Sequence, residues 1–209
     1  MRRVRGDWTA DELQEFWRDP PGKGNRPEAY LSEVTAGRSE LLLDLLRPLA
    51  SEDAPLLEVG CNVGRNLNAL HEAGFRDLTA IEINSGALDL LREQFPELAR
   101  DARLINSSVE EAAPQLGDDE FRVVYTMAVL EHIHTASEWI FEHMVRAASH
   151  AVITIEDERM VSWRHFVRNY REVFEGLGMV QVEELQCGPE HGLDSGFVAR
   201  VFQHPPRGE

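Results

Sequence analysis

One segment of eleven residues constrains the fold more than any other part of the chain. It runs from Leu57 to Leu67 as Leu-Glu-Val-Gly-Cys-Asn-Val-Gly-Arg-Asn-Leu, so an apolar strand passes through a glycine-containing turn into a helix. A second apolar segment, Leu78 to Asn84, carries Glu82. In an open α/β sheet, an acidic residue about 20 residues after the turn meets the ribose of a bound nucleotide. The two segments therefore predict an α/β protein with a nucleotide-cofactor site.

The spacing of the glycines limits which class of cofactor the turn can bind. A dinucleotide loop needs Gly-x-Gly-x-x-Gly, but counting from Gly60 the second and third positions hold Asn62 and Arg65. This departure disfavours a nicotinamide-dependent dehydrogenase. The remaining pattern, Glu58-x-Gly60-x-Asn62-x-Gly64, still permits a sharp turn because Asn enters positive φ more readily than most residues. Such a turn suits a nucleoside that carries an amino-acid tail and no phosphate, namely S-adenosylmethionine.

Three motifs resemble those of the class I S-adenosylmethionine-dependent methyltransferases, and the resemblance runs over nearly the whole chain. Residues 56–64 are similar to the first motif of the family, residues 80–84 to the second, and residues 121–133 to the motif of the fourth strand. The motif style is closest to a small-molecule subset that includes methylases associated with pseudaminic acid biosynthesis. The resemblance implies S-adenosyl-L-methionine as the cofactor and S-adenosyl-L-homocysteine as the product.

The chain alternates expected strands and helices, which predicts a mainly parallel sheet. We expect an α/β, Rossmann-like sheet of seven strands with one antiparallel strand, the number the family has, and helices on both faces. The expected strands are residues 56–59, 78–83, 102–106, 121–127, 151–156, 179–184 and 197–203, and the expected helices are residues 65–73, 85–94, 137–149 and 163–175.

The N-terminal region is expected to differ from the rest. We expect residues 1–50 to form a helical lid and residues 51–209 the S-adenosylmethionine-binding domain, in one compact domain overall. Family members often place such helices over the cofactor, and Trp8, Trp17, Arg26 and Tyr30 are the residues suited to line a lid. For Trp17 we expect plain helix packing instead, whereas for Tyr30 both roles stay open.

Composition limits the partners. The net charge is −16 with a single lysine, and no clustered basic face is evident, so nucleic acid is not an expected partner. No apolar run reaches the ~18 residues of a membrane span, and the N-terminus lacks a signal-peptide pattern, so we expect a cytoplasmic protein without membrane contact. An acidic entrance favours a neutral or cationic small molecule as methyl acceptor. Cys61 and Cys187 are expected to be free thiols.

The cofactor residues follow from the motifs. Glu82 is expected to accept hydrogen bonds from both ribose hydroxyls. The resemblance puts Glu58 near the methionyl amine, although orienting the loop is a compatible role, and Asn66 could contact the same tail or cap a helix. Ser108 and the Val109 amide are candidates for the adenine, with helix capping as the alternative. The full expected set is Tyr30, Glu58, Gly60, Cys61, Asn62, Gly64, Asn66, Glu82, Ile83, Ser108, Val109 and Met127.

The catalytic residues are less defined. His132 and His134 follow the fourth strand and are the candidate bases, with a structural role as the alternative for His132. Some class I O-methyltransferases hold a divalent ion with a Glu-x-x-Glu-His cluster here, but Ala128 replaces the first Glu. Glu131 and His132 remain and His165 is a conceivable third ligand, yet we expect no metal.

The acidic run 156–158 is expected to bind a substrate ammonium or to form a solvated loop. The predicted function is methyl transfer to oxygen or nitrogen of a small molecule, and a non-catalytic S-adenosylmethionine-binding module is the main alternative.

Overall fold

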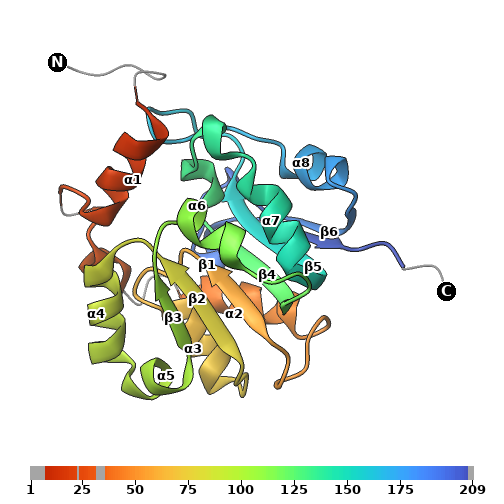
Figure 1. The fold of residues 1–209 in the computed structure, drawn as a ribbon, viewed down its shortest axis with the longest axis horizontal. Coiled ribbons are helices and arrows are strands. Elements are labelled where there is room, and N and C mark those ends of the chain that lie inside the picture. The colour runs from red at the N-terminus through yellow and green to blue at the C-terminus, as the bar shows by residue number, and fades with distance from the viewer. Residues whose placement is uncertain (1–7, 23, 32–35, 207–209) are drawn as a thin grey trace.

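The computed structural model describes residues 8–22, 24–31 and 36–206, and a seven-stranded sheet forms its centre (Figure 1). The strand order is β3-β2-β1-β4-β5-β7-β6. Among these described strands, only β7 runs antiparallel to its neighbours, β5 and β6, which confirms the expected single antiparallel strand. The strands are β1 Leu56–Val59, β2 Leu78–Glu82, β3 Arg103–Asn106, β4 Phe121–Met127, β5 Ala148–Asp157, β6 Val180–Gln186 and β7 Phe197–Gln203.

Helices cover both faces of this sheet because its central strands are apolar on both sides. Leu56 and Leu57 show the alternation: the first belongs to the core on one face and the second to the core on the other. The first core also holds residues of α2, α3 and α4, and the second holds residues of α6, α7 and α8 (Figure 1). The helices are α1 Ala10–Arg18, α2 Ala36–Leu46, α3 Arg65–Glu72, α4 Ser85–Gln94, α5 Pro96–Asp101, α6 Val109–Ala112, α7 Ile140–Ala147 and α8 Tyr170–Gly176.

The N-terminal helices lie in two different places. Helix α2 packs its leucines into the core beside α3, so it is an integral layer of the domain. Helix α1 projects over the sheet edge at which the cofactor loop lies (Figure 1). Its N-cap is Thr9, which forms a capping box with Glu12. A single turn of 3-10 helix, Pro27–Leu31, precedes α2.

Two expected helices differ from those observed. The helix predicted at residues 163–175 begins only at Tyr170, because Asn169 caps it by accepting the backbone N–H of Arg171 at 3.1 Å. Residues 163–169 instead form a turn and an extended segment. The helix predicted at residues 137–149 is also too long, since β5 already begins at Ala148. Within the described residues, no helix is long and apolar enough to cross a membrane.

Candidate functional site

The turn between β1 and α3 has the conformation that the sequence predicts. Gly60, Asn62 and Gly64 all have positive φ, at 76°, 49° and 73°. The Gly60 N–H donates to the carbonyl of Ile81 at 2.8 Å, so the turn is tied to the end of the neighbouring strand β2. Gly60 also has no room for a side chain, because a Cβ there would lie 2.5 Å from Cγ2 of Val129. The turn therefore brings backbone close to whatever binds beside it.

Glu82 is the last residue of β2, and its carboxylate is hydrogen-bonded to this turn. One of its carboxylate oxygens accepts the backbone N–H of Asn62 at 2.8 Å and the other accepts that of Asn84 at 2.8 Å. Burial raises the pKa of Glu82, and these backbone hydrogen bonds oppose that shift. Since each carboxylate oxygen has two lone pairs, both oxygens can still accept a bond from a ligand hydroxyl.

Glu58 is the second buried acid of the site. Its carboxyl is 2% exposed and accepts hydrogen bonds from Tyr125 Oη at 3.3 Å and Asn66 Nδ2 at 3.5 Å. Burial raises its pKa to about 8, and these two hydrogen bonds oppose that shift. A buried carboxylate is costly without a positive partner. The site therefore favours a cation such as an ammonium group beside Glu58.

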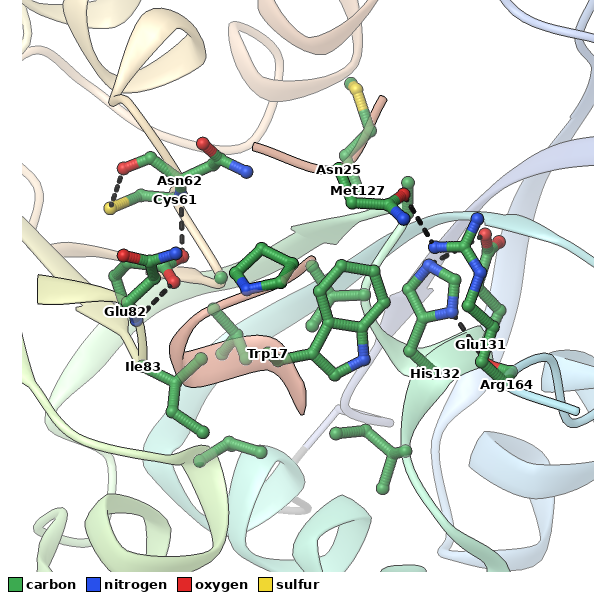
Figure 2. Close-up of a pocket in the computed structure, with 18 of the residues that line it drawn as sticks. Trp17, Asn25, Cys61, Asn62, Glu82, Ile83, Met127, Glu131, His132 and Arg164 are labelled. Carbon is green, nitrogen blue, oxygen red and sulfur yellow. Dashed lines mark hydrogen bonds and ion pairs between the residues drawn. The ribbon is translucent and has the colours of Figure 1, made fainter. Parts of the chain in front are cut away.

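A cavity of about 580 Å³ opens over the turn. Every residue of the expected cofactor set borders it except Gly64, and both expected catalytic histidines border it as well. Gly64 instead serves as the N-cap of α3. Figure 2 shows Asn62 and Glu82 on one side of the cavity and His132, Glu131 and Arg164 on the other, with Trp17 between them. The cavity therefore joins the cofactor loop to the end of β4.

An unsatisfied polar atom marks the cofactor side of this cavity. The side-chain oxygen of Asn62 is buried and has no hydrogen-bond partner among the described residues. A buried acceptor without a donor costs about 1–3 kcal/mol, so this atom suits a donor group on a ligand. Cys61 beside it lines the same cavity, and burial raises its pKa well above the ordinary value, which keeps its thiol protonated.

The start of α6 is where the sequence analysis expected the adenine contacts. Ser108 is the N-cap of this helix and its hydroxyl accepts the backbone N–H of Glu111 at 3.2 Å. The side chain of Glu111 accepts a hydrogen bond from Ser107 Oγ at 3.1 Å. Asn106 donates its side-chain N–H to the carbonyl of Glu82 at 2.8 Å. Capping is thus present, and Ser108 and Val109 also border the cavity.

The two histidines differ in the hydrogen bonds they make. His132 Nδ1 lies 2.8 Å from the carbonyl of Arg164, so this nitrogen carries the proton and Nε2 has a free lone pair. Burial lowers the pKa of His132 to about 3, which makes it a weak base. His134 Nδ1 accepts the backbone N–H of Ala136 at 3.0 Å and thereby caps a short turn. In its neutral form, His134 has no second lone pair for a substrate proton.

The acidic run at the end of β5 is structural rather than solvated. Glu156 is fully buried and accepts Thr126 Oγ1 at 2.6 Å and the backbone N–H of Val129 at 2.9 Å. Glu158 forms an ion pair with Arg200 at 2.8 Å. Asp157 borders the cavity. The expectation of a solvated loop is therefore wrong.

Of the four N-terminal residues expected to line a lid, two border the cavity and two do not. Trp17 and Tyr30 border the cavity, whereas Trp8 stacks on Trp163 with ring centroids 4.6 Å apart. Arg26 is exposed and does not border the cavity. The ring of Trp17 lies 4.6 Å from that of His132, so plain helix packing was the wrong expectation for Trp17.

Several residues that border the cavity were not among the predicted site residues, and Arg164 is one of them. Arg164 stacks its guanidinium over Trp17 at 5.4 Å and donates to Asn25 Oδ1 at 2.9 Å. No sequence pattern pointed to it, because it lies in the segment that was expected to be helical. Its place in the cavity comes from the turn that precedes α8.

Comparison with known sequences identifies a domain within the chain. Residues 56–150 match the sequence profile of a family described as "Methyltransferase domain". No curated protein matches the chain with significant similarity.

Solved structures share its fold. One is a chain of the "Complex between the Haloferax volcanii Trm112 methyltransferase activator and the putative methyltransferase", with 12% identity, a TM-score of 0.72 and coverage of 96% of this chain and 100% of that chain. Another is Burkholderia thailandensis 1,6-didemethyltoxoflavin-N1-methyltransferase with bound 1,6-didemethyltoxoflavin and S-adenosylhomocysteine, with 14% identity, a TM-score of 0.67 and coverage of 93% and 86%. An Aquifex aeolicus SAM-dependent methyltransferase has 12% identity, a TM-score of 0.67 and coverage of 87% and 98%.

The sequence match identifies the domain, and the solved structures identify the fold. Residues 56–150 are therefore a methyltransferase domain by sequence, and the chain has the Rossmann-like fold of the class I S-adenosylmethionine-dependent methyltransferases.

Proposed function

We propose that this protein is an enzyme that transfers the methyl group of S-adenosylmethionine to an oxygen or nitrogen atom of a small molecule. The observation that carries the proposal is the cavity of about 580 Å³ that joins the turn after β1 to the end of β4. Cavities of about 300–1,000 Å³ are typical of small-molecule sites. Trp17 covers part of this cavity, which supports a small acceptor over a polymer.

The residues of the turn would hold the cofactor. When bound, S-adenosylmethionine supplies an electrophilic methyl group on a positively charged sulfur. Glu82 would accept the ribose hydroxyls while keeping its bonds to the backbone of the turn. Glu58 and Asn66 would bind the amino-acid tail, since Glu58 is buried and its nearest hydrogen-bond partners are neutral. Ser108, Val109 and Ile83 would border the adenine.

The acceptor would lie at the other end of the cavity. Methyl transfer needs the acceptor atom to be aligned with the methyl group and, for a neutral nucleophile, to lose a proton. His132 has a free lone pair on Nε2 but is a weak base, and His134 uses its lone pair to cap a turn. We therefore assign these residues mainly to alignment. Acidic residues outnumber the three arginines along the cavity, in keeping with a neutral or cationic acceptor.

A screen for transferred label tests the proposal. The full chain is incubated with methyl-labelled S-adenosylmethionine and with amines, sugars, phenols and carboxylates in parallel. We expect label in at least one class of small molecule and formation of S-adenosylhomocysteine in equal amount. Glu82→Ala, in which cofactor binding should be weakened, serves as the control and should transfer less label. Label transfer confined to protein or nucleic acid acceptors would contradict the proposal.

A further inference from the structure

Three side chains at the acceptor end of the cavity converge on one point. Glu131 and His132 come from the short turn after β4, and His165 comes from the segment before α8, where an isolated bridge between Ser162 and His165 fixes the backbone. Glu131 Oε1 lies 3.6 Å from His132 Nε2 and 3.7 Å from His165 Nε2. Donor atoms of all three lie within 4.8 Å of one another. Residues far apart in sequence thus present one oxygen and two nitrogens to a common centre.

The distances between the carboxylate oxygen and the two imidazole nitrogens suit a bound ion better than direct hydrogen bonds. At 3.6 and 3.7 Å, the carboxylate oxygen is too far from either nitrogen for a hydrogen bond. His132 Nε2 carries a lone pair because its Nδ1 donates to the carbonyl of Arg164. Two acceptor atoms therefore face each other, an arrangement that a cation bound between them would stabilise. An ion bonded at about 2.0–2.2 Å to each ligand holds neighbouring ligands roughly 3–3.5 Å apart, so the two pairs that include Glu131 need to close by only a few tenths of an ångström.

Each of the three side chains is held by a second partner. His132 Nδ1 lies 2.8 Å from the Arg164 carbonyl, and His165 Nδ1 lies 2.5 Å from Ser162 Oγ. The other oxygen of Glu131 accepts the backbone N–H of Asp157 at 2.5 Å. Such outer partners fix the ring orientation and tautomer of metal-binding histidines. They leave Nε2 of His132, Nε2 of His165 and Oε1 of Glu131 directed at one another.

We propose that Glu131, His132 and His165 form a binding site for one divalent metal ion. This assignment departs from the sequence analysis, which expected no metal because Ala128 replaces a Glu. Two imidazoles and one carboxylate favour Zn²⁺, Co²⁺, Mn²⁺ or Fe²⁺ over the oxygen-preferring Mg²⁺ and Ca²⁺. Glu131 and His165 are buried, with 3% and 7% exposure. Nearby, Glu156 and Asp157 are acidic and Arg164 is the opposing cation, so the surrounding charge favours a positive ion.

The site also selects among acceptors, an inference that rests on the proposed function. Three protein ligands leave coordination positions free, and Ala128 keeps the adjacent wall of the cavity small. A metal ion polarises a hydroxyl and lowers its pKa, so the favoured acceptor bears a hydroxyl group. The hydroxyl oxygen gives its proton to solvent and forms the new bond to the methyl carbon. The carbon–sulfur bond breaks and its electron pair stays on the sulfur, which leaves a neutral thioether.

Metal titration of the full chain tests the site. The protein is stripped with a chelator, dialysed and titrated with CoCl₂ and ZnCl₂ by calorimetry, and the cobalt form is recorded by visible absorption. We expect one ion per chain. His165→Ala and Glu131→Gln should weaken binding about 100-fold or more, and the outer-partner variant Ser162→Ala roughly 10- to 100-fold. His134→Ala, which changes a histidine of the same cavity outside the cluster, should bind within about 3-fold of wild type, because it removes no ligand or outer partner.

Folding and cofactor binding are measured in parallel by circular dichroism and by S-adenosylhomocysteine titration. If His165→Ala does not fold, Ser162→Ala supplies the same comparison. Absence of stoichiometric binding by wild type, or equal loss in His134→Ala, overturns the metal site. If the stripped protein binds S-adenosylhomocysteine but no metal, the metal site is wrong and the proposed function stands. If the protein binds metal but transfers no methyl group to any small molecule, the proposed function is wrong and the metal site stands. Transfer to a hydroxyl that survives chelation unchanged overturns the selection of acceptors.

Discussion

The carboxylate of Glu82 accepts the backbone N–H of Asn62 at 2.8 Å. Glu82 ends β2 and Asn62 lies in the turn after β1, so the two most informative residues of the sequence are in contact. The contact has a physical consequence. The positive φ of Asn62 directs its N–H at the carboxylate, which holds Glu82 in place before any ribose binds. The turn and the acid therefore act as one preorganised unit.

Loss of the Glu82 carboxylate should weaken cofactor binding. Removing a hydrogen bond to a charged group costs about 1.5–3 kcal/mol, so Glu82→Ala is expected to lower the affinity for S-adenosylhomocysteine roughly 10- to 100-fold. Calorimetric titration measures this directly. Glu183→Ala, at an exposed position of β6, is the control and should bind as wild type does. Unchanged affinity in Glu82→Ala would remove Glu82 from the site.

A side chain at Gly60 should destabilise the fold. Its φ is 76°, and a Cβ would lie 2.5 Å from Cγ2 of Val129. Strain and overpacking together predict a loss of about 2–4 kcal/mol for Gly60→Ala, measured by urea unfolding. Gly176→Ala is the matched control, because nothing lies within 4 Å of a Cβ there.

Val129→Ala in the Gly60→Ala background relieves the clash but leaves the backbone strain. We expect it to recover part of the lost stability. Full stability of Gly60→Ala alone would show that the turn adopts another conformation.

Local signals predicted the elements around the turn after β1 better than the segments at the other end of the cavity. The bounds of α4 agree with the predicted residues 85–94, since Asn84 caps the helix and accepts the N–H of Ala87 at 3.1 Å. Cofactor residues lie on consecutive segments whose order along the chain fixes their order in the sheet. The acceptor half depends instead on contacts between distant segments.

Residues 163–169, before α8, show why the sequence did not predict this part of the site. Arg168 donates to the carbonyls of Leu130 and Ile133, at 3.0 and 2.7 Å, and these bonds hold residues 163–169 outside a helix. No local pattern reports such tertiary bonds. The pair Asn169 and Glu172 was the one available signal, since Asn followed by Glu three residues later marks a helix start.

Trp17 should report occupation of the cavity. It borders the cavity and its ring lies 4.6 Å from that of His132, whereas Trp8, Trp139 and Trp163 do not border the cavity. Titration with S-adenosylhomocysteine should therefore change tryptophan fluorescence mainly through Trp17. We expect Trp17→Phe to lose most of the change and Trp139→Phe, at a position 41% exposed, to keep it. A full change in Trp17→Phe would show that α1 does not cover the bound cofactor.

Stability should fall with rising pH through Glu58. Burial raises its pKa to about 8 in the folded chain, above the ordinary 4.5. A raised folded pKa means that its contribution is complete below about pH 4.5 and is lost as pH rises to about 8. Between pH 5.5 and 8.5 this loss amounts to about 3 kcal/mol, because one pKa unit corresponds to about 1.4 kcal/mol.

Glu58→Gln removes this titration while keeping an acceptor for Tyr125 and Asn66. Urea unfolding at pH 5.5 and pH 8.5 should therefore show a smaller loss of unfolding free energy in Glu58→Gln than in wild type, by about 3 kcal/mol. Other buried acids titrate equally in both proteins, so the difference isolates Glu58. Glu183→Gln, at the exposed position, should behave as wild type. Parallel pH profiles for wild type and Glu58→Gln would mean that Glu58 is already ionised at pH 5.5, and its carboxylate would then need a positive partner within the folded chain.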